Sequence, residues 1–148
     1  MGPPVRVQGR ALPRVNLFVD TSVWSLAFRR DQAQGELAVD RLRQALGGGE
    51  AVFSTGLVLQ ELLQGFSGPK ARDAIIERFT ALPLLVPDRE DHIAAAEIRN
   101  ECRRAGVQIG TIDALLARLC IRHELEVLTT DHDFDRMVPQ VGLTIWHP

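Results

Sequence analysis

Four acidic residues stand in apolar surroundings, where an acid is unexpected. Asp20 ends the apolar run "LFV", Glu61 lies inside "VLQELLQ", Asp113 lies among isoleucine and leucine in "GTIDALLARLC", and Asp131 ends "EVLTTD". Because an isolated buried charge is costly, acids in such places usually have a partner. Four carboxylates brought together could not all stay ionised without compensation, and a divalent cation would supply it. Ligands that are all oxygen select a hard cation, Mg²⁺ or Mn²⁺, over zinc.

Acids arranged around such a cation could hydrolyse a phosphodiester bond. The cation lowers the pKa of a bound water, orients that water and stabilises charge on a phosphoryl group under attack. Taken singly, each acid has another explanation: Asp20 could cap the helix that "SVWSLAF" begins, Glu61 could pair with an arginine or lie on a solvated strip, and Asp113 could satisfy a helix N-terminus. The presence of all four in one chain favours the cation site.

Strands and helices alternate along the chain that carries these acids. Short apolar runs predict strands over 17–19, 51–54, 84–87, 126–131 and 143–147. Apolar residues at helical intervals predict helices over 22–28, 35–47, 55–66, 69–82, 88–106 and 111–124. Asp88 and Thr111 are the expected N-caps of the last two helices, and Gly106 ends the first of these. Helix 55–66 is apolar on almost every side, so it should be largely buried.

This order of elements predicts an α/β fold, a three-layer α/β/α sandwich around a mostly parallel central sheet of four to five strands. Such sheets bind ligands at the carboxyl ends of their strands, near the point where the strand order reverses. Asp20 and Asp131 occupy that position, the carboxyl end, on the first and fourth strands. If these strands are neighbours, the two carboxylates face one crevice, and Thr21 or Ser22 is left to cap the following helix.

The chain is long enough for one domain with a proper core. It has 148 residues, of which 45% are hydrophobic, and we expect a loose N-terminal extension over 1–14 and a single domain over 15–148. It lacks the run of about eighteen apolar residues that spans a membrane, and its start lacks the apolar stretch of a secretory signal, so we expect a cytoplasmic protein. Cys102 and Cys120 stand alone, as expected of buried thiols.

The charged and aromatic residues set limits on how this chain could bind nucleic acid. The net charge is −2, but all of the 17 basic residues except Lys70 are arginine. Arginine binds phosphate in bidentate fashion, which permits an arginine-lined groove beside an acidic centre. Tyrosine is absent and the tryptophans are Trp24 and Trp146, so a binding surface built on stacked aromatic rings is poorly supplied.

Four segments of the chain resemble a known family. The segments "FVDTSVW", "QELLQG", "GVQIGTIDALLARLC" and "VLTTDHDFDRM" resemble, in order and spacing, the acidic motifs of PIN-domain ribonucleases, and most closely those of the VapC toxins of toxin-antitoxin pairs. The resemblance runs from about Asn16 to Trp146. It implies a PIN-like fold and a Mg²⁺- or Mn²⁺-dependent endoribonuclease. It also implies an RNA substrate, a homodimer and a cognate antitoxin that covers the site.

Carried over position by position, the resemblance makes Asp20, Glu61, Asp113 and Asp131 the catalytic acidic centre. It makes Asp20, Asp113 and Asp131 the metal ligands. Asp131 is preferred over its neighbours because it directly follows the strand. Asp133 could be a second ligand or could cap a short turn that begins at Phe134. The hydroxyl residues Thr21, Ser22 and Thr111 could orient carboxylates or waters, and helix capping explains each equally well.

Two other functions compete with the nuclease. A catalytically silent PIN-like adaptor would bind RNA or a protein without cutting, although it has no need to concentrate negative charge where it must approach phosphate. A phosphatase with an aspartyl nucleophile at Asp20 is a weaker match, because the second acid of that pattern is replaced by Ser22. Metal binding discriminates the nuclease from the adaptor, since the adaptor should bind no metal at these acids.

Overall fold

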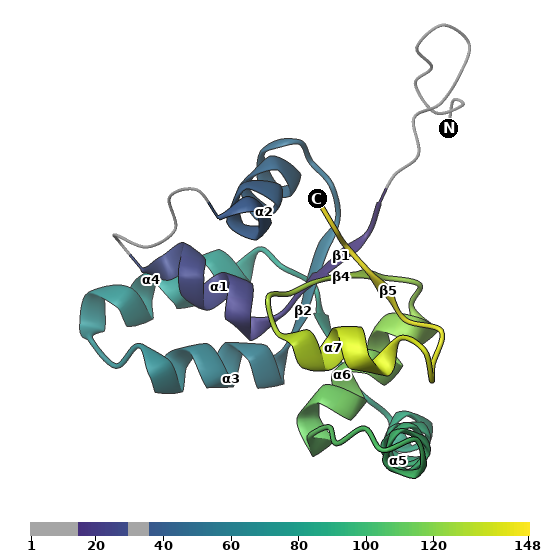
Figure 1. Ribbon diagram of the computed structural model, residues 1–148. Helices are drawn as coiled ribbons and strands as arrows, with labels where there is room; N and C mark the ends of the chain where they lie inside the picture. The colour runs from purple at the N-terminus through teal and green to yellow at the C-terminus, as the bar shows by residue number, and fades with distance from the viewer. Residues whose placement is uncertain (1–14, 30–35) are drawn as a thin grey trace, which may run out of the picture.

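Five parallel strands form the central sheet, and helices lie on both of its sides (Figure 1). The structure is a computed structural model and describes residues 15–29 and 36–148. The strands are β1 (Leu17–Val19), β2 (Val52–Thr55), β3 (Leu84–Leu85), β4 (Glu126–Leu128) and β5 (Thr144–Ile145). They are hydrogen-bonded in the order β3-β2-β1-β4-β5, and every pair is parallel. The predicted mostly parallel sheet is confirmed.

The helices form two groups, one for each face of the sheet. The first group is α1 (Thr21–Phe28), α2 (Leu37–Gly47), α3 (Gly56–Gly65) and α4 (Pro69–Thr80), and the second is α5 (Arg89–Arg104), α6 (Thr111–Arg122) and α7 (His132–Met137). Contacts link α1 to α2 and α3, and α3 to α4, whereas α6 contacts α5 and α7. In Figure 1 the two groups flank the strands, which confirms the three-layer α/β/α sandwich.

Strand β1 forms the middle of the hydrophobic core. Leu17, Phe18 and Val19 are fully buried, as expected for a strand that is covered on both faces by helices. Phe18 is in register with Phe53 of β2 on one side and Val127 of β4 on the other. Burial of each such side chain contributes about 1.5–3 kcal/mol. The strand is therefore a rigid support for Asp20, the residue that follows Val19.

A buried carboxylate joins α5 to α6. Asp91 is 0% exposed, and its carboxylate accepts hydrogen bonds from Arg118 Nε at 2.9 Å and Arg122 Nη1 at 2.7 Å, both on α6. It also accepts the backbone N–H of Asp88 at 2.9 Å, which completes a capping box and confirms Asp88 as the N-cap of α5. Burial acts to raise the pKa of Asp91, but the Asp88 N–H and the two guanidinium groups lower it to about 2.

Helix α3 is amphipathic, so the prediction that it is largely buried is wrong. Val58 and Leu62 are its buried residues, whereas Gln60, Glu61 and Gln64 lie on its exposed side. Gln60 Nε2 donates to Gln64 Oε1 at 2.9 Å along this polar strip. The leucines that made the helix look uniformly apolar are half-buried beside the core.

Other expectations concern the ends of the chain and its cysteines. Cys102 and Cys120 are free and buried, as predicted. Gly106 follows α5 with a φ of 82°, a left-handed conformation that favours glycine at a helix end. The expected extension, 1–14, lies outside the described residues. Within the described part of the chain, no helix is long and apolar enough to cross a membrane.

Candidate metal centre

The carboxyl ends of β1 and β4 lie side by side where the strand order reverses. The two strands pair in parallel, with Val19 in register with Leu128, and the backbone N–H of Asp20 donates to the Leu128 carbonyl at 3.0 Å. The condition stated for the sequence, that the first and fourth strands are neighbours, is therefore met. The expectation that Asp131 directly follows the strand is wrong, because β4 ends at Leu128 and two threonines intervene. Of these two threonines, Thr129 donates its hydroxyl to the Asp20 carboxylate.

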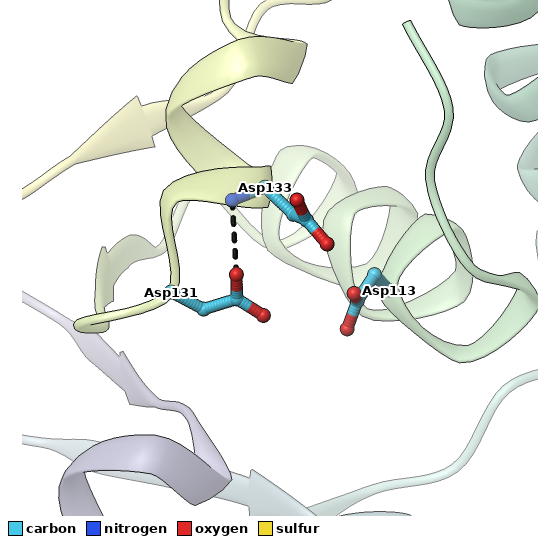
Figure 2. A group of neighbouring side chains, drawn as sticks. All are labelled: Asp113, Asp131 and Asp133. Carbon is cyan, nitrogen blue, oxygen red and sulfur yellow. Dashed lines mark hydrogen bonds between the residues drawn. The ribbon is translucent and has the colours of Figure 1, made fainter.

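Three aspartates come together at this edge, from two different helices. Figure 2 shows Asp113 on α6 facing Asp131 and Asp133 at the start of α7. Each offers one carboxylate oxygen, and these three oxygens all lie within 4.8 Å of one another. Asp131 is the N-cap of α7, and its Oδ1 accepts the backbone N–H of Asp133 at 2.9 Å. Helix α7 begins at His132, so the short turn expected from Phe134 starts earlier than predicted.

Asp20, a predicted ligand, is not one of the three grouped aspartates, but its charge acts on Asp113 and one of its oxygens is fixed by hydroxyl groups. It is 6% exposed, and its Oδ2 accepts Ser22 Oγ and Thr129 Oγ1, each at 2.9 Å. Asp20 is also the N-cap of α1, with the Ser22 N–H 3.4 Å from the same oxygen. The expectation that Thr21 or Ser22 caps this helix is therefore wrong. One short side chain thus both caps the helix and accepts two hydroxyl groups.

The two hydroxyl groups tie Asp20 to the loop that carries Asp131. Thr129 Oγ1 accepts the N–H of Asp131 at 2.9 Å, and Ser22 Oγ accepts the N–H of Thr130 at 3.0 Å. Each hydroxyl has a single proton, which it donates to Asp20, so backbone donors fill its acceptor positions. Thr129 was not among the residues predicted from the sequence. The pair of threonines before Asp131 was the available signal.

Glu61 and Thr111 lie at the exposed margin of the centre. Glu61 Oε1 accepts the hydroxyl of Thr21 at 2.8 Å, which links α3 to α1. Thr111 was expected to cap α6, but Gly110 is the N-cap, with no side-chain cap bond, and Thr111 is the exposed first residue of the helix. The Thr111 hydroxyl is oriented by no hydrogen bond to the described residues. Of the predicted hydroxyl residues, Thr21 and Ser22 thus contact predicted acids.

The charges of the acids act on one another. The pKa of Asp113 is raised to about 7, first by burial and then by the negative charges of Asp20, Asp131, Asp133 and Glu61. Burial also raises the pKa of Asp20, against the opposing effect of the Ser22 and Thr129 hydroxyls. The four predicted acids and Asp133 thus lie close enough to interact. A donor set made of carboxylate oxygens whose negative charges act on one another fits a hard divalent cation.

Removal of the Thr129 hydroxyl is expected to weaken the centre without unfolding the protein. Thr129→Val keeps the shape of the side chain but removes one of the two hydroxyl donors that hold Asp20 Oδ2. Loss of a partner that orients a metal ligand typically costs about 10–100-fold in metal affinity or activity. Metal titration by calorimetry measures it. Thr130→Val is the matched control, because the Thr130 side chain is hydrogen-bonded to none of the described residues, and equal effects of both variants would contradict this role.

The sequence and the fold were compared with those of known proteins. The family model described as "PIN domain" matches residues 17–138. The chain is 34% identical over 122 residues to "VapC ribonuclease Mb1587" of Mycobacterium bovis and to "Ribonuclease VapC11" of Mycobacterium tuberculosis. Each alignment covers 80% of this chain and 89% of the relative.

Solved structures share the fold at lower identity. VapBC2 from Rickettsia felis, bound to a DNA fragment from its promoter, has a TM-score of 0.70 and 18% identity, over 89% of this chain and 98% of that chain. FitAcB from Neisseria gonorrhoeae has a TM-score of 0.68 and 21% identity, over 89% of this chain and 97% of that chain. These likenesses show the same fold, and the family model together with the curated relatives shows the family. The chain therefore belongs to the PIN domain family.

Proposed function

We propose that this chain is a metal-dependent endoribonuclease that acts as the toxin of a VapBC-type toxin-antitoxin pair. The observation that carries the proposal is the group formed by Asp113, Asp131 and Asp133, beside a buried Asp20 at the carboxyl edge of the sheet. The names of the curated relatives describe ribonucleases, and we extend that activity to this chain. The proposed function places the protein in the cytoplasm, with its RNA substrate.

The proposed cation is Mg²⁺ or Mn²⁺, held by Asp20, Asp113 and Asp131, with Asp133 as a further candidate ligand. Such a cation, when bound, supplies a water of lowered pKa and stabilises charge on the phosphoryl group. Burial and two hydroxyl donors hold the Asp20 carboxylate in one orientation. Glu61 is kept at the margin by Thr21, and we assign its other oxygen, Oε2, to accept a proton from the attacking water.

The proposal is tested by cleavage of total RNA with the purified chain in Mg²⁺, in Mn²⁺ and in chelator. We expect metal-dependent cutting by the wild type and none by Asp20→Asn, because the amide removes a negative charge and offers a weaker ligand. Metal should also raise the melting temperature of the wild type, and this rise should disappear in Asp20→Asn. Cutting that continues in chelator would contradict the metal-dependent mechanism.

The adaptor and the phosphatase predict other outcomes of the same experiment. An adaptor would cut no RNA and its melting temperature would not respond to metal. A phosphatase would act on phosphomonoesters through Asp20 as the nucleophile. The 6% exposure of Asp20 and the engagement of its Oδ2 by two hydroxyl groups favour a ligand over a nucleophile. The convergence of so many carboxylates likewise favours the nuclease over an adaptor.

Two protein partners belong to the proposal, a cognate antitoxin that covers the acidic centre and a second copy of this chain. The solved neighbours include VapBC from Salmonella typhimurium bound to DNA and VapBC-1 from Haemophilus influenzae, which supports an antitoxin partner. Next to Asp113, a cavity of about 330 Å³ opens between α3, α5 and α6 and has a mostly apolar lining. Ile112, on its wall, is 38% exposed. Exposed apolar surface of this kind is typical of protein contacts.

A further inference from the structure

We propose that Arg136 is a positioning residue that holds the Asp133 carboxylate in place as a ligand of the cation. Nothing in the four acidic motifs assigns a role to Arg136, which lies in the last turn of α7. The inference rests on the proposed function, because it concerns how the same centre binds its metal. Of the two roles that the sequence leaves open for Asp133, the proposal takes that of a ligand.

The guanidinium group of Arg136 bridges the two segments that supply the aspartates. Its Nη2 donates to Asp133 Oδ1, one turn earlier on α7, and lies 3.4 Å from the Gln108 carbonyl. Gln108 lies in the loop between α5 and α6, five residues before Asp113. One nitrogen atom therefore contacts a carboxylate of the centre and the loop that leads to Asp113. This bridge links α7 to the loop that leads into α6.

In the part of the chain that the structure describes, Asp133 lacks the hydroxyl and backbone donors that hold the carboxylates of Asp20 and Asp131. Asp20 is held by two hydroxyl groups and Asp131 by the N–H of Asp133. The Asp133 carboxylate is 36% exposed and bonds, among the described residues, to Arg136 alone. The carboxylates of Asp113 and Asp131 each place an oxygen within 4.8 Å of an oxygen of Asp133, and their like charges repel it. The ion pair with Arg136 opposes that repulsion and keeps the carboxylate turned toward its neighbours.

A positioning role and a purely electrostatic role of Arg136 predict opposite changes in metal affinity when the charge of Arg136 is removed. A positive charge beside a cation site weakens cation binding by direct repulsion, so its removal alone would tighten binding. If Arg136 instead holds the Asp133 carboxylate in place, its removal weakens metal binding. The Asp133 carboxylate would then be mobile and would have to be ordered each time the cation binds. The direction of the change in metal affinity therefore separates the two roles.

The experiment is calorimetric titration of Mn²⁺ or Mg²⁺ into the full chain and its Arg136→Gln variant. We expect metal affinity to fall about 10-fold in Arg136→Gln, with partial recovery in Arg136→Lys, which keeps the charge. Arg103→Gln is the matched control, because Arg103 lines the same small cavity as Gln108 and pairs with Asn100 instead of an aspartate of the centre. This control removes the same charge and is expected to leave the affinity unchanged.

A double variant shows whether Arg136 acts through Asp133. Asp133→Asn alone is expected to weaken metal binding, and adding Arg136→Gln should weaken it no further, because contacting residues with a shared role are not additive. Unchanged or tighter binding in Arg136→Gln would overturn the proposal. So would normal metal affinity with a raised KM for RNA, which would make Arg136 a phosphate-binding residue. A wild type that binds no metal and cuts no RNA would instead overturn the proposed function itself.

Discussion

The Asp113→Asn variant is expected to cut RNA about 10³-fold more slowly than the wild type, because a cation site is worth several kcal/mol and each 1.4 kcal/mol changes the rate tenfold. Burial, and then the negative charges of the neighbouring acids, raise the pKa of Asp113 to about 7. The same substitution should raise the melting temperature of the protein in chelator, since it removes one of several like charges held together. The variant would thus gain stability while losing activity.

Initial rates of cleavage at saturating metal, and thermal melts in chelator, measure the two effects of Asp113→Asn. Asp73→Asn is the matched control, because Asp73 lies on α4, its side chain is 79% exposed, and its only ion pair among the described residues is with the adjacent Arg72. That control should change neither quantity. An Asp113→Asn variant that is less stable than the wild type in chelator would show that the carboxylates do not repel one another as the structure indicates.

The second large effect concerns stability and lies away from the centre. Asp91→Asn is expected to lower the free energy of unfolding by about 3 kcal/mol, because breaking a buried ion pair leaves charges without compensation. This expected loss lies at the low end of the range for a broken buried ion pair. The side chains of Arg118 and Arg122 are 27% and 40% exposed, so they remain partly hydrated. Urea unfolding measures the change. Glu90→Gln, an exposed neighbour in the same helical turn, should change it by less than about 0.5 kcal/mol.

The stability that Asp91 supplies should depend on pH in a defined window. Its folded pKa of about 2 lies below the ordinary value of 3.8, so the unfolded chain binds the proton more readily between these values. The contribution is therefore fully present above pH 4 and is lost as the pH falls toward 2. The difference in stability between the wild type and Asp91→Asn should shrink over that interval. A difference that stays constant down to pH 2 would contradict the ion pair.

The sequence was informative where a local pattern and a fold rule agree. "LFV" predicted a buried strand, and the edge rule for parallel sheets placed Asp20 beside the end of β4, as the structure shows. The role of Thr129 could not be predicted from a local pattern, because Thr129 and the Asp20 that it contacts are 109 residues apart in the sequence. The cap of α1 was ambiguous, since Asp20, Thr21 and Ser22 are adjacent and all three residue types cap helices well. Only the backbone geometry decides among them.

Helix α3 and Arg136 show two further limits of sequence reasoning. The apolar residues of α3 outnumber its polar ones, but the sheet and its neighbours cover one side of it, and the residue pattern does not state how wide that side is. Arg136 is one arginine among many in the sequence. Its proposed role depends on a contact with the backbone carbonyl of Gln108. Every residue has a backbone carbonyl, so the residue types in a sequence do not indicate such a contact.

The hydroxyl donors at Asp20 have a consequence for which cations the centre can accept. With Oδ2 engaged by Ser22 and Thr129, Asp20 would offer the proposed cation only Oδ1 and would bind it through a single oxygen. Calcium relies on six to eight oxygen ligands and often on bidentate carboxylates, whereas magnesium is satisfied by one or two carboxylate oxygens and its own waters. In the proposed site, the two hydroxyl protons would therefore favour magnesium over calcium without contacting the ion.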